Sequence, residues 1–127
     1  MASFPRSARL VRPDDFRRVF AQPIRFGDRY LTVLARPNDV GAARLGLAVS
    51  RRRIGSAVRR NLFKRIVRER FRHWRDRLGG HDLVVMPKPA AAEAPRAQLR
   101  ASIDRQWGLL ERRSAGGRDP RPGDPEQ

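Results

Sequence analysis

Residues 55–74 read GSAVRRNLFKRIVRERFRHW, and this stretch is predicted to form one long helix around which the rest of the chain packs. Ser56 stands where an N-cap belongs, and Gly79 and Gly80 follow past the end. Residues 57–74 hold no glycine or proline, which allows about five uninterrupted turns.

The predicted helix has two unlike faces. At about 100° per residue, one face carries cations and one amide, namely Arg60, Asn61, Lys64, Arg65, Arg68 and Arg72. The opposite face is apolar and consists of Val58, Leu62, Phe63, Ile66, Val67 and Trp74. Arg59 and Arg70 also fall within the apolar face, and we expect them at its edges with their guanidinium groups in water. The pattern predicts one flank packed on a sheet and one flank facing an anionic partner.

The charge of the whole chain also indicates a polyanionic partner. Its 127 residues carry 29 Lys and Arg against 13 Asp and Glu, a formal net charge of +16, which is far more than solubility requires. The length is that of one domain. The chain has no cysteine and no apolar run long enough to span a bilayer, so we expect a cytoplasmic protein without a membrane partner.

The remaining predicted elements give an α+β order. They are a helix at 13–21, a weak strand at 24–26, strands at 29–36, 44–50 and 82–86, and a helix at 95–113. The loop between the second and third strands permits an antiparallel pair, and the apolar run at 82–86 fits a central strand. The order αβββαβα predicts a single-domain sandwich with helices packed on a mainly antiparallel sheet.

The two ends of the chain differ in composition from its middle. We assign residues 1–12 to a flexible basic arm, 13–112 to the folded domain and 113–127 to a disordered tail.

Two groups of residues have two possible roles each. Phe16 and Phe20 lie one turn apart on the first helix, and their rings belong either to the core or to the border of a groove where unpaired bases stack, at about 1–3 kcal/mol per base. The three arginines at 51–53 form either a solvated turn or phosphate contacts beside the N-terminus of the long helix.

The sequence predicts no catalytic residue, no metal ligand and no cofactor bound by the protein alone. The acids are scattered and form no pair placed for acid–base chemistry or for two metal ions. His73 and His81 have no evident carboxylate or serine partner. We therefore do not expect a self-sufficient nuclease.

Two motifs carry a family resemblance. Residues 44–50 read RLGLAVS, and residues 57–72 follow the pattern AVxRNxxKRxxRExFR. Together they closely resemble the protein component of bacterial ribonuclease P, and the resemblance extends from about residue 10 to residue 112. The family's signature usually reads Arg-Asn-Arg, whereas this chain has Leu62 at the third position, and its arginine loop is one residue longer than the usual form.

The resemblance implies a basic subunit that assists a catalytic RNA in cutting the 5′ leader from precursor tRNA. Contacts to that RNA are then expected from Arg51, Arg52, Arg60, Asn61, Lys64, Arg65, Arg68 and Arg72. A leader-binding cleft is expected to include Phe16, Phe20, Val33, Arg60 and Asn61. Mg²⁺ is expected in the holoenzyme through the RNA, and the protein is expected to be monomeric before assembly.

The resemblance also implies a left-handed βαβ crossover around the long helix, although such connections are right-handed in about 98% of proteins.

Charge, size and fold class alone leave other functions open. The main alternative is a ribosomal or other structural RNA-binding protein. An independent endoribonuclease and a DNA-binding helix module are further alternatives. The motif at 57–72 favours the ribonuclease P interpretation.

Overall fold

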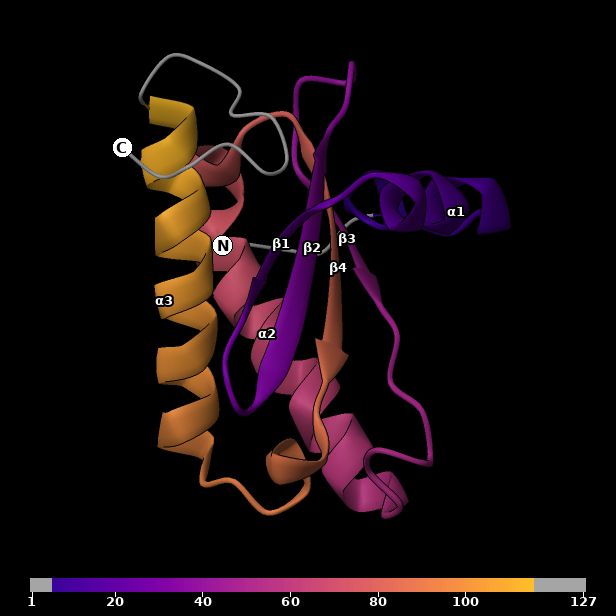
Figure 1. The fold of residues 1–127 in the computed structure, drawn as a ribbon, viewed down its shortest axis with the longest axis vertical. Helices are drawn as coiled ribbons and strands as arrows, with labels where there is room; N and C mark the ends of the chain where they lie inside the picture. Colours follow the sequence, from indigo (N-terminus) through magenta and orange to yellow (C-terminus); the bar gives the residue numbers. More distant parts are fainter. Residues whose placement is uncertain (1–5, 116–127) are drawn as a thin grey trace.

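In the computed structural model, which describes residues 6–115, three α-helices pack on a four-stranded sheet (Figure 1). The elements, with two short 3₁₀ helices marked η, are η1 (Arg6–Ala8), α1 (Pro13–Ala21), β1 (Ile24–Gly27), β2 (Leu31–Pro37), β3 (Arg44–Leu47), α2 (Ala57–Leu78), β4 (His81–Pro87), η2 (Pro89–Ala92) and α3 (Arg96–Ala115). The predicted αβββαβα order of helices and strands is confirmed.

The sheet has the strand order β1-β2-β4-β3. The pairs β1/β2 and β2/β4 are antiparallel, and β3 is parallel to β4, so the mainly antiparallel sheet is confirmed. The antiparallel pair that the loop between β2 and β3 permits does not form, because β4 lies between these two strands. As predicted, β4 is central, and six of its seven residues are buried.

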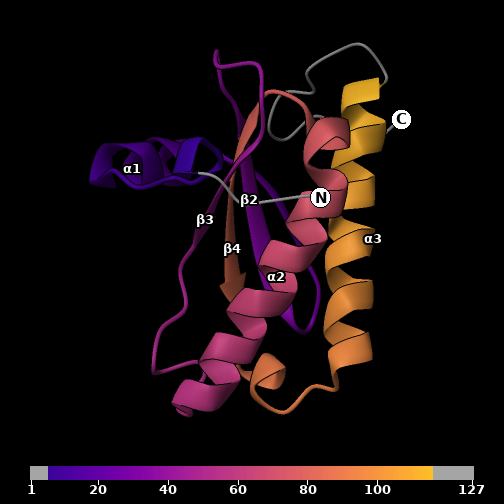
Figure 2. The ribbon, with the colours of Figure 1, turned by 180° about the vertical axis from the view of Figure 1, so that it is seen from behind.

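The connection from β3 through α2 to β4 is a left-handed crossover. In Figure 1, β3 lies to the right of β4, both strands run down the page, and α2 returns upward behind the sheet. Figure 2 shows the same helix from behind, in front of the strands. The handedness implied by the family resemblance is therefore present, against the general preference.

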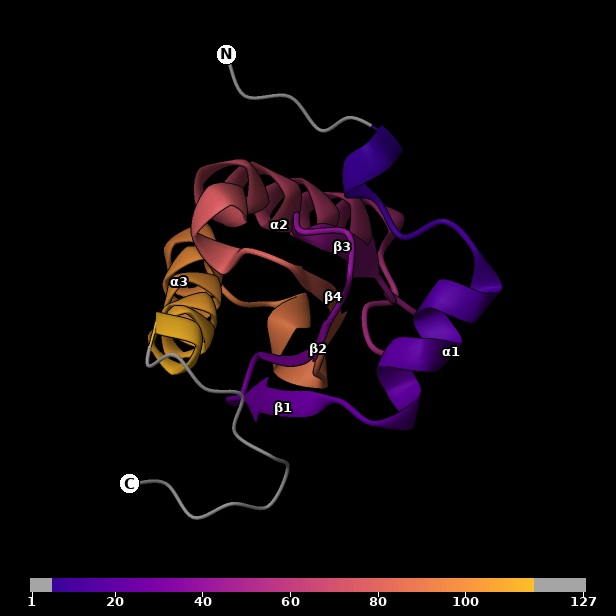
Figure 3. The same cartoon turned by 90° about the horizontal axis from the view of Figure 1, so that it is seen from above.

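The two faces of the sheet are covered unequally (Figure 3). Helices α2 and α3 cover one face, where Phe71 and Trp107 meet edge to face with ring centroids 5.9 Å apart. Helix α1 lies on the other face above a smaller cluster of Leu10, Val19, Leu34 and Val84. Each large apolar side chain that is fully buried in this way contributes roughly 1.5–3 kcal/mol to stability.

Helix α2 begins at the predicted cap and ends later than predicted. The Ser56 hydroxyl accepts a hydrogen bond from the Arg59 amide at 3.2 Å, and Gly79 at the C-cap has φ of 65°, which favours glycine. The buried residues of α2 are Phe63, Ile66, Val67, Phe71, Trp74 and Leu78. The prediction is wrong for Val58, which is 77% exposed because the first turn of α2 lies beyond the strand ends (Figure 1).

The segment before α1 is better ordered than predicted. Residues 6–12 were expected to belong to a flexible arm, but Ala8 and Leu10 are buried and the Leu10 amide donates to the Leu45 carbonyl at 3.0 Å. Residues 113–115, assigned to the tail, continue α3. The rest of the predicted arm and tail, residues 1–5 and 116–127, lies outside the described residues.

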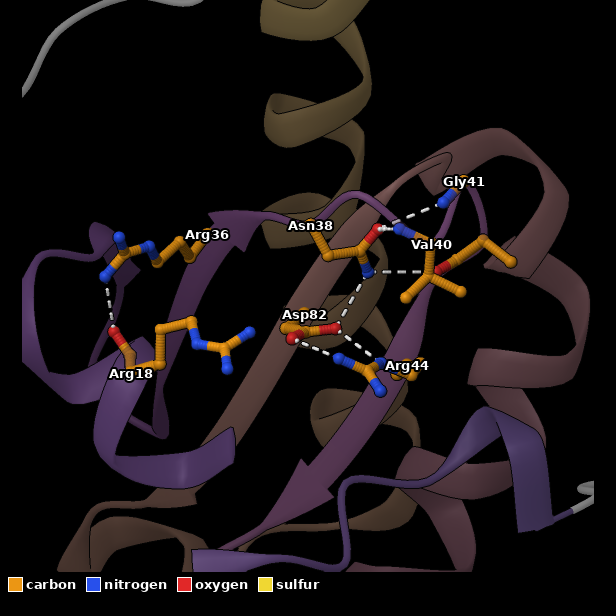
Figure 4. Close-up of polar contacts among 8 residues, drawn as sticks. Arg18, Arg36, Asn38, Val40, Gly41, Arg44 and Asp82 are labelled. Carbon is orange, nitrogen blue, oxygen red and sulfur yellow. Dashed lines mark hydrogen bonds and ion pairs between the residues drawn. The ribbon is translucent and has the colours of Figure 1, made fainter. Parts of the chain in front are cut away.

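A buried carboxylate joins the start of β3, the start of β4 and the residue that follows β2 (Figure 4). Asp82, 2% exposed, accepts hydrogen bonds from Arg44 Nε and Nη2 and from Asn38 Nδ2, each at 2.8 Å. The hydrogen-bonded carboxylate raises the pKa of Arg44 above its ordinary value. Because these residues come from β3, β4 and the end of β2, the cluster stabilises the order of the three strands.

A second carboxylate joins the opposite end of the sheet to α3. Asp28, in the turn between β1 and β2, accepts from the backbone amides of Tyr30 and Leu31 at 2.8 and 3.2 Å. It also accepts from Ser102 Oγ and from Arg105 Nη2 on α3. Burial alone would raise the pKa of Asp28, but these four donors outweigh it and lower the pKa to about 2.

We predict that Asp28→Asn lowers the free energy of unfolding by about 1–2 kcal/mol at pH 7. Because folding depresses the Asp28 pKa from 3.8 to about 2, its contribution is present above pH 4 and lost as the pH falls toward 2. Urea unfolding of both proteins from pH 7 to pH 2 measures this difference. Asp14→Asn is the control, because its exposed pair with Arg17 should contribute little. A difference for Asp28→Asn that stays constant down to pH 2 would contradict the assignment.

Candidate nucleic-acid interface

The solvent side of α2 carries the predicted cationic residues. A shallow hollow on this side is lined by Asn61, Arg65, Arg68, Glu69 and Arg72, all of them exposed. We call these five residues the cationic face of α2. Lys64 is half-buried beside it. The face combines three guanidinium groups and one amide with a single carboxylate, so its chemistry suits phosphate oxygens.

The other arginines of α2 are used inside the protein. Arg59 donates from Nε to the Ala92 carbonyl at 2.6 Å and from Nη2 to the carbonyls of Ala91 and Ala94 at 3.2 and 2.8 Å. Arg70 Nε pairs with Asp104 on α3 at 2.9 Å. The expectation that these two guanidinium groups extend to water is therefore wrong. Each has an acceptor on the segment packed beside α2.

Two more arginines near the end of α2 follow the same rule. Arg77 forms a two-bond ion pair with Glu111 of α3, which raises the pKa of Arg77 and lowers that of Glu111. Arg75 donates from Nε to the Ala43 carbonyl at 3.2 Å. The arginines of α2 thus form two groups. Those that face α3, η2 or the strand ends have acceptors within the protein, and those of the cationic face are exposed to solvent.

The arginine loop, residues 51–53, lies between β3 and α2. Arg51 and Arg52 are exposed, whereas Ile54 is buried in the main core. Arg53 donates from Nη1 to the Pro87 carbonyl at 3.3 Å. Arg60, predicted to contact both RNAs, directs Nη1 back to the carbonyls of Ile54 and Gly55, at 2.9 and 2.8 Å.

A groove of about 440 Å³ lies on the face of the sheet that carries α1. Its lining comes from all four strands or their ends, and consists of Arg25, Thr32, Ala48, Val49, Ser50, Arg53, Met86 and Pro87. We call it the sheet groove. Ala48 and Met86 also pack against the same small cluster as Phe16, so the groove lies beside the first turn of α1. Arg53 belongs to both the groove and the arginine loop, so the groove and the loop meet there.

Phe16 and Phe20 have different surroundings. Phe16 is half-buried on the sheet, where a Cβ at Gly46 would lie 2.6 Å from its ring. Phe20 is 46% exposed. Of the two roles left open by the sequence, Phe16 thus has a packing role next to the groove, while Phe20 presents an open ring.

The prediction that Val33 forms part of a leader-binding cleft is wrong. Val33 is 0% exposed and belongs to the core under α2 and α3, on the face of the sheet opposite to Phe16. Side chains alternate along a strand, so its neighbour Thr32 faces the groove instead. Asn61 is exposed on α2, as predicted.

Sequence reasoning did not select the groove residues Arg25, Thr32 and Met86, and it left Arg53 open between a solvated turn and a phosphate contact. The alternation in β2 gave little guidance, because both of its faces are covered and Leu31, Val33, Leu34 and Ala35 are all buried. Pro87 at the end of β4 and the arginines at 51–53 were sequence signals near this site.

No three His, Asp or Glu side chains in residues 6–115 lie close enough to hold a metal ion. His81 Nδ1 lies 2.8 Å from the Leu78 carbonyl, and His73 is exposed. In the same part of the chain, no helix is both long and apolar enough to cross a membrane.

The fold and the interface together define a small basic α+β protein with an outward cationic helix joined to a groove on its sheet. Comparison with known proteins identifies its family. The family model described as Ribonuclease P matches residues 4–111. A ribonuclease P protein component from Methylococcus capsulatus is 47% identical over 117 residues, covering 92% of this chain and 91% of the relative. The chain belongs to the ribonuclease P protein family.

Solved structures agree with this assignment. The RNase P protein of Staphylococcus aureus superposes with a TM-score of 0.75 at 26% identity, over 80% of this chain and 94% of the other. The RNase P protein of Thermotoga maritima superposes with a TM-score of 0.68 at 33% identity, over 82% of this chain and 96% of the other.

We predict that Gly46→Ala destabilises the protein by about 1–3 kcal/mol, because the new methyl group must displace the Phe16 ring. Thermal or urea unfolding measures the loss. Gly27→Ala in β1 is the matched control: its Cβ would meet the Leu31 carbonyl at an ordinary 3.4 Å, so its stability should change by less than about 1 kcal/mol. Equal stability of the two variants would show that Phe16 does not pack closely on the sheet.

Proposed function

We propose that this chain acts as the protein subunit of ribonuclease P, binds the catalytic RNA and the 5′ leader of precursor tRNA, and assists removal of the leader. The observation that carries the proposal is the division of the α2 arginines. Arg59 and Arg70 have internal acceptors, while Arg65 and Arg72 are exposed on the cationic face. A surface with this excess of outward cations suits an anionic partner, and family membership supports RNA as that partner.

The catalytic RNA occupies the cationic face in this proposal. The contacts come from residues of α2 and the arginine loop, namely Arg51, Arg52, Asn61, Lys64, Arg65, Arg68 and Arg72. A rigid helix holds the guanidinium groups at fixed spacing, and the planar fork of each suits two phosphate oxygens. If about six phosphates are neutralised, log affinity falls with log salt at a slope of roughly −4 to −5.

The leader of the precursor tRNA lies along the sheet groove in this proposal. Arg25 and Arg53 line the groove and can donate hydrogen bonds to the leader phosphates, and Thr32 and Met86 contribute to the floor under the bases. The exposed ring of Phe20 offers stacking at the border. Arg53 connects this groove to the loop that faces the catalytic RNA, so one protein contacts both RNAs at once.

The chemical step belongs to the RNA in this proposal. Phosphate oxygens of the catalytic RNA hold Mg²⁺ with its waters, which is the ligand set that this ion prefers. The protein supplies position and charge neutralisation: it binds the leader beside the catalytic RNA and thereby raises the local concentration of the substrate. The proposal takes the protein as a monomer before assembly and places it with its precursor tRNA in the bacterial cytoplasm.

We predict that the purified protein restores cleavage of precursor tRNA by a bacterial ribonuclease P RNA at low Mg²⁺ concentration, where the RNA alone is weakened by phosphate repulsion. Gel analysis of the released leader measures the rate. Protein without the RNA should leave the substrate intact. Failure to stimulate the RNA would favour the alternative of a structural RNA-binding protein, and cleavage by protein alone would contradict the assignment of chemistry to the RNA.

We predict that two classes of α2 variant affect different quantities, one RNA binding and the other the stability of the fold. Replacing Arg65 and Arg72 together with Ala should weaken binding to ribonuclease P RNA by roughly tenfold or more and reduce the salt slope by about 1.5, without loss of stability. Arg70→Ala should instead cost about 1 kcal/mol of stability, because Asp104 loses its ion pair, and should leave the slope unchanged. Filter binding across a salt series and urea unfolding measure the two quantities. A reduced slope in Arg70→Ala would contradict the division.

A further inference from the structure

The arginine loop is held to the body of the protein by several contacts. The Ile54 amide donates to the Ser50 carbonyl at 3.1 Å, and the Arg53 amide donates to Ser50 Oγ at 3.3 Å. The Ile54 side chain is buried, and Arg53 Nη1 contacts the Pro87 carbonyl at the end of β4. These contacts set the path of the backbone on which Arg51 and Arg52 are exposed.

Arg60 closes this loop from the helix side. Its Nη1 donates to the carbonyls of both Ile54 and Gly55, at 2.9 and 2.8 Å. Both carbonyls precede the Ser56 cap, so the bonds join the loop to the first turns of α2. A cation near a helix N-terminus is disfavoured by the helix dipole, and two carbonyl acceptors offset that cost.

The arginines of the loop are directed differently. Arg51 and Arg52 are exposed, and no acceptor for either guanidinium is found among the described residues. Arg60 is only half-exposed. To reach a phosphate with Nη1, Arg60 would have to release both carbonyls, of which the bond to the Ile54 carbonyl is partly buried and the bond to the Gly55 carbonyl is exposed. An unpaired carbonyl in partly buried surroundings is costly.

We propose that Arg60 is a positioning residue: it acts on RNA binding by holding Arg51 and Arg52 in place, and its Nη1 is not itself a phosphate ligand. This inference rests on the proposed function and deepens it, because it divides the residues of the RNA interface into those that touch the RNA and one that orders them. The contact of Arg60 with RNA expected from the family resemblance becomes indirect.

A double-mutant cycle tests the proposal. The binding of full-length protein to a labelled bacterial ribonuclease P RNA is measured for wild type, Arg60→Ala, the Arg51→Ala/Arg52→Ala pair, and the combination of all three. Residues that act as one unit show strong coupling, whereas independent ligands give effects that multiply. We expect Arg60→Ala to weaken binding by nearly the same factor as the loop pair, and to add less than about twofold when the loop pair is already absent.

Arg72→Ala provides the matched control, because Arg72 is exposed on the same helix without contact to the loop. Its effect should multiply with that of the loop pair. The salt slope gives an independent readout: loss of one direct ligand lowers the slope by about 0.7–0.9, whereas displacement of two loop arginines lowers it by up to about twice that amount.

The outcomes separate this proposal from the broader function. Effects of Arg60→Ala and the loop pair that multiply, or full wild-type affinity of Arg60→Ala, would overturn the positioning role alone. Absence of wild-type binding to the RNA would overturn the proposed function as well. Circular dichroism checks that each variant is folded. If Arg60→Ala does not fold, the same cycle with Arg60→Gln supplies the coupling, because glutamine keeps part of the side-chain packing but lacks the guanidinium Nη1 that donates to the two carbonyls.

Discussion

The structure depends on how α2 accommodates more arginines than a single exposed face can hold. The helix has to bury one flank under the sheet and beside α3, yet arginines occur on that flank too. A guanidinium placed there without a partner would be costly. Arg59 resolves this by donating to three carbonyls around η2, and Arg70 by pairing with Asp104 of α3. Because those guanidinium groups have partners inside the protein, the arginines of the cationic face are the ones that α2 presents to solvent on that side.

The same contacts explain the geometry of the interface. Arg59 donates hydrogen bonds to carbonyls of the segment that follows β4. Arg53 donates to the carbonyl of Pro87, the last residue of β4. The central strand therefore fixes both the start of α2 and the arginine loop. The sheet groove lies on the face of the sheet away from α2 and α3, and Arg53 lies where the groove meets the loop. A protein of one domain thus presents both a cationic helix face and a groove on its sheet.

Local signals predicted much of the fold. Ser56 and Gly79 are found at the two ends of α2, and the apolar run of β4 lies at the centre of the sheet. The errors involve information that local patterns lack. Val58 follows the helical period but lies in a turn that extends past the sheet, and β3 pairs with a strand that comes after α2 in the chain. Handedness was available only through the family resemblance.

The interface was predictable in its charge and less so in its residues. The outward position of Asn61, Arg65, Arg68 and Arg72 follows from the helical period alone. The misplacement of Val33 arises because both faces of β2 are buried, so that alternation does not tell which face meets the groove. The acceptors of Arg59, Arg60 and Arg70 lie on other segments or in the preceding loop, where no periodicity indicates them.

The measurement that tests the division of the arginines most directly is modification by an arginine-specific dicarbonyl reagent, read out by mass spectrometry with and without ribonuclease P RNA. In the free protein, Arg51, Arg52, Arg65 and Arg72 should react fast and Arg59, Arg70 and Arg44 slowly. Bound RNA should protect the fast group and leave the slow group unchanged. Uniform reactivity in the free protein, or protection of Arg70 by RNA, would contradict the account.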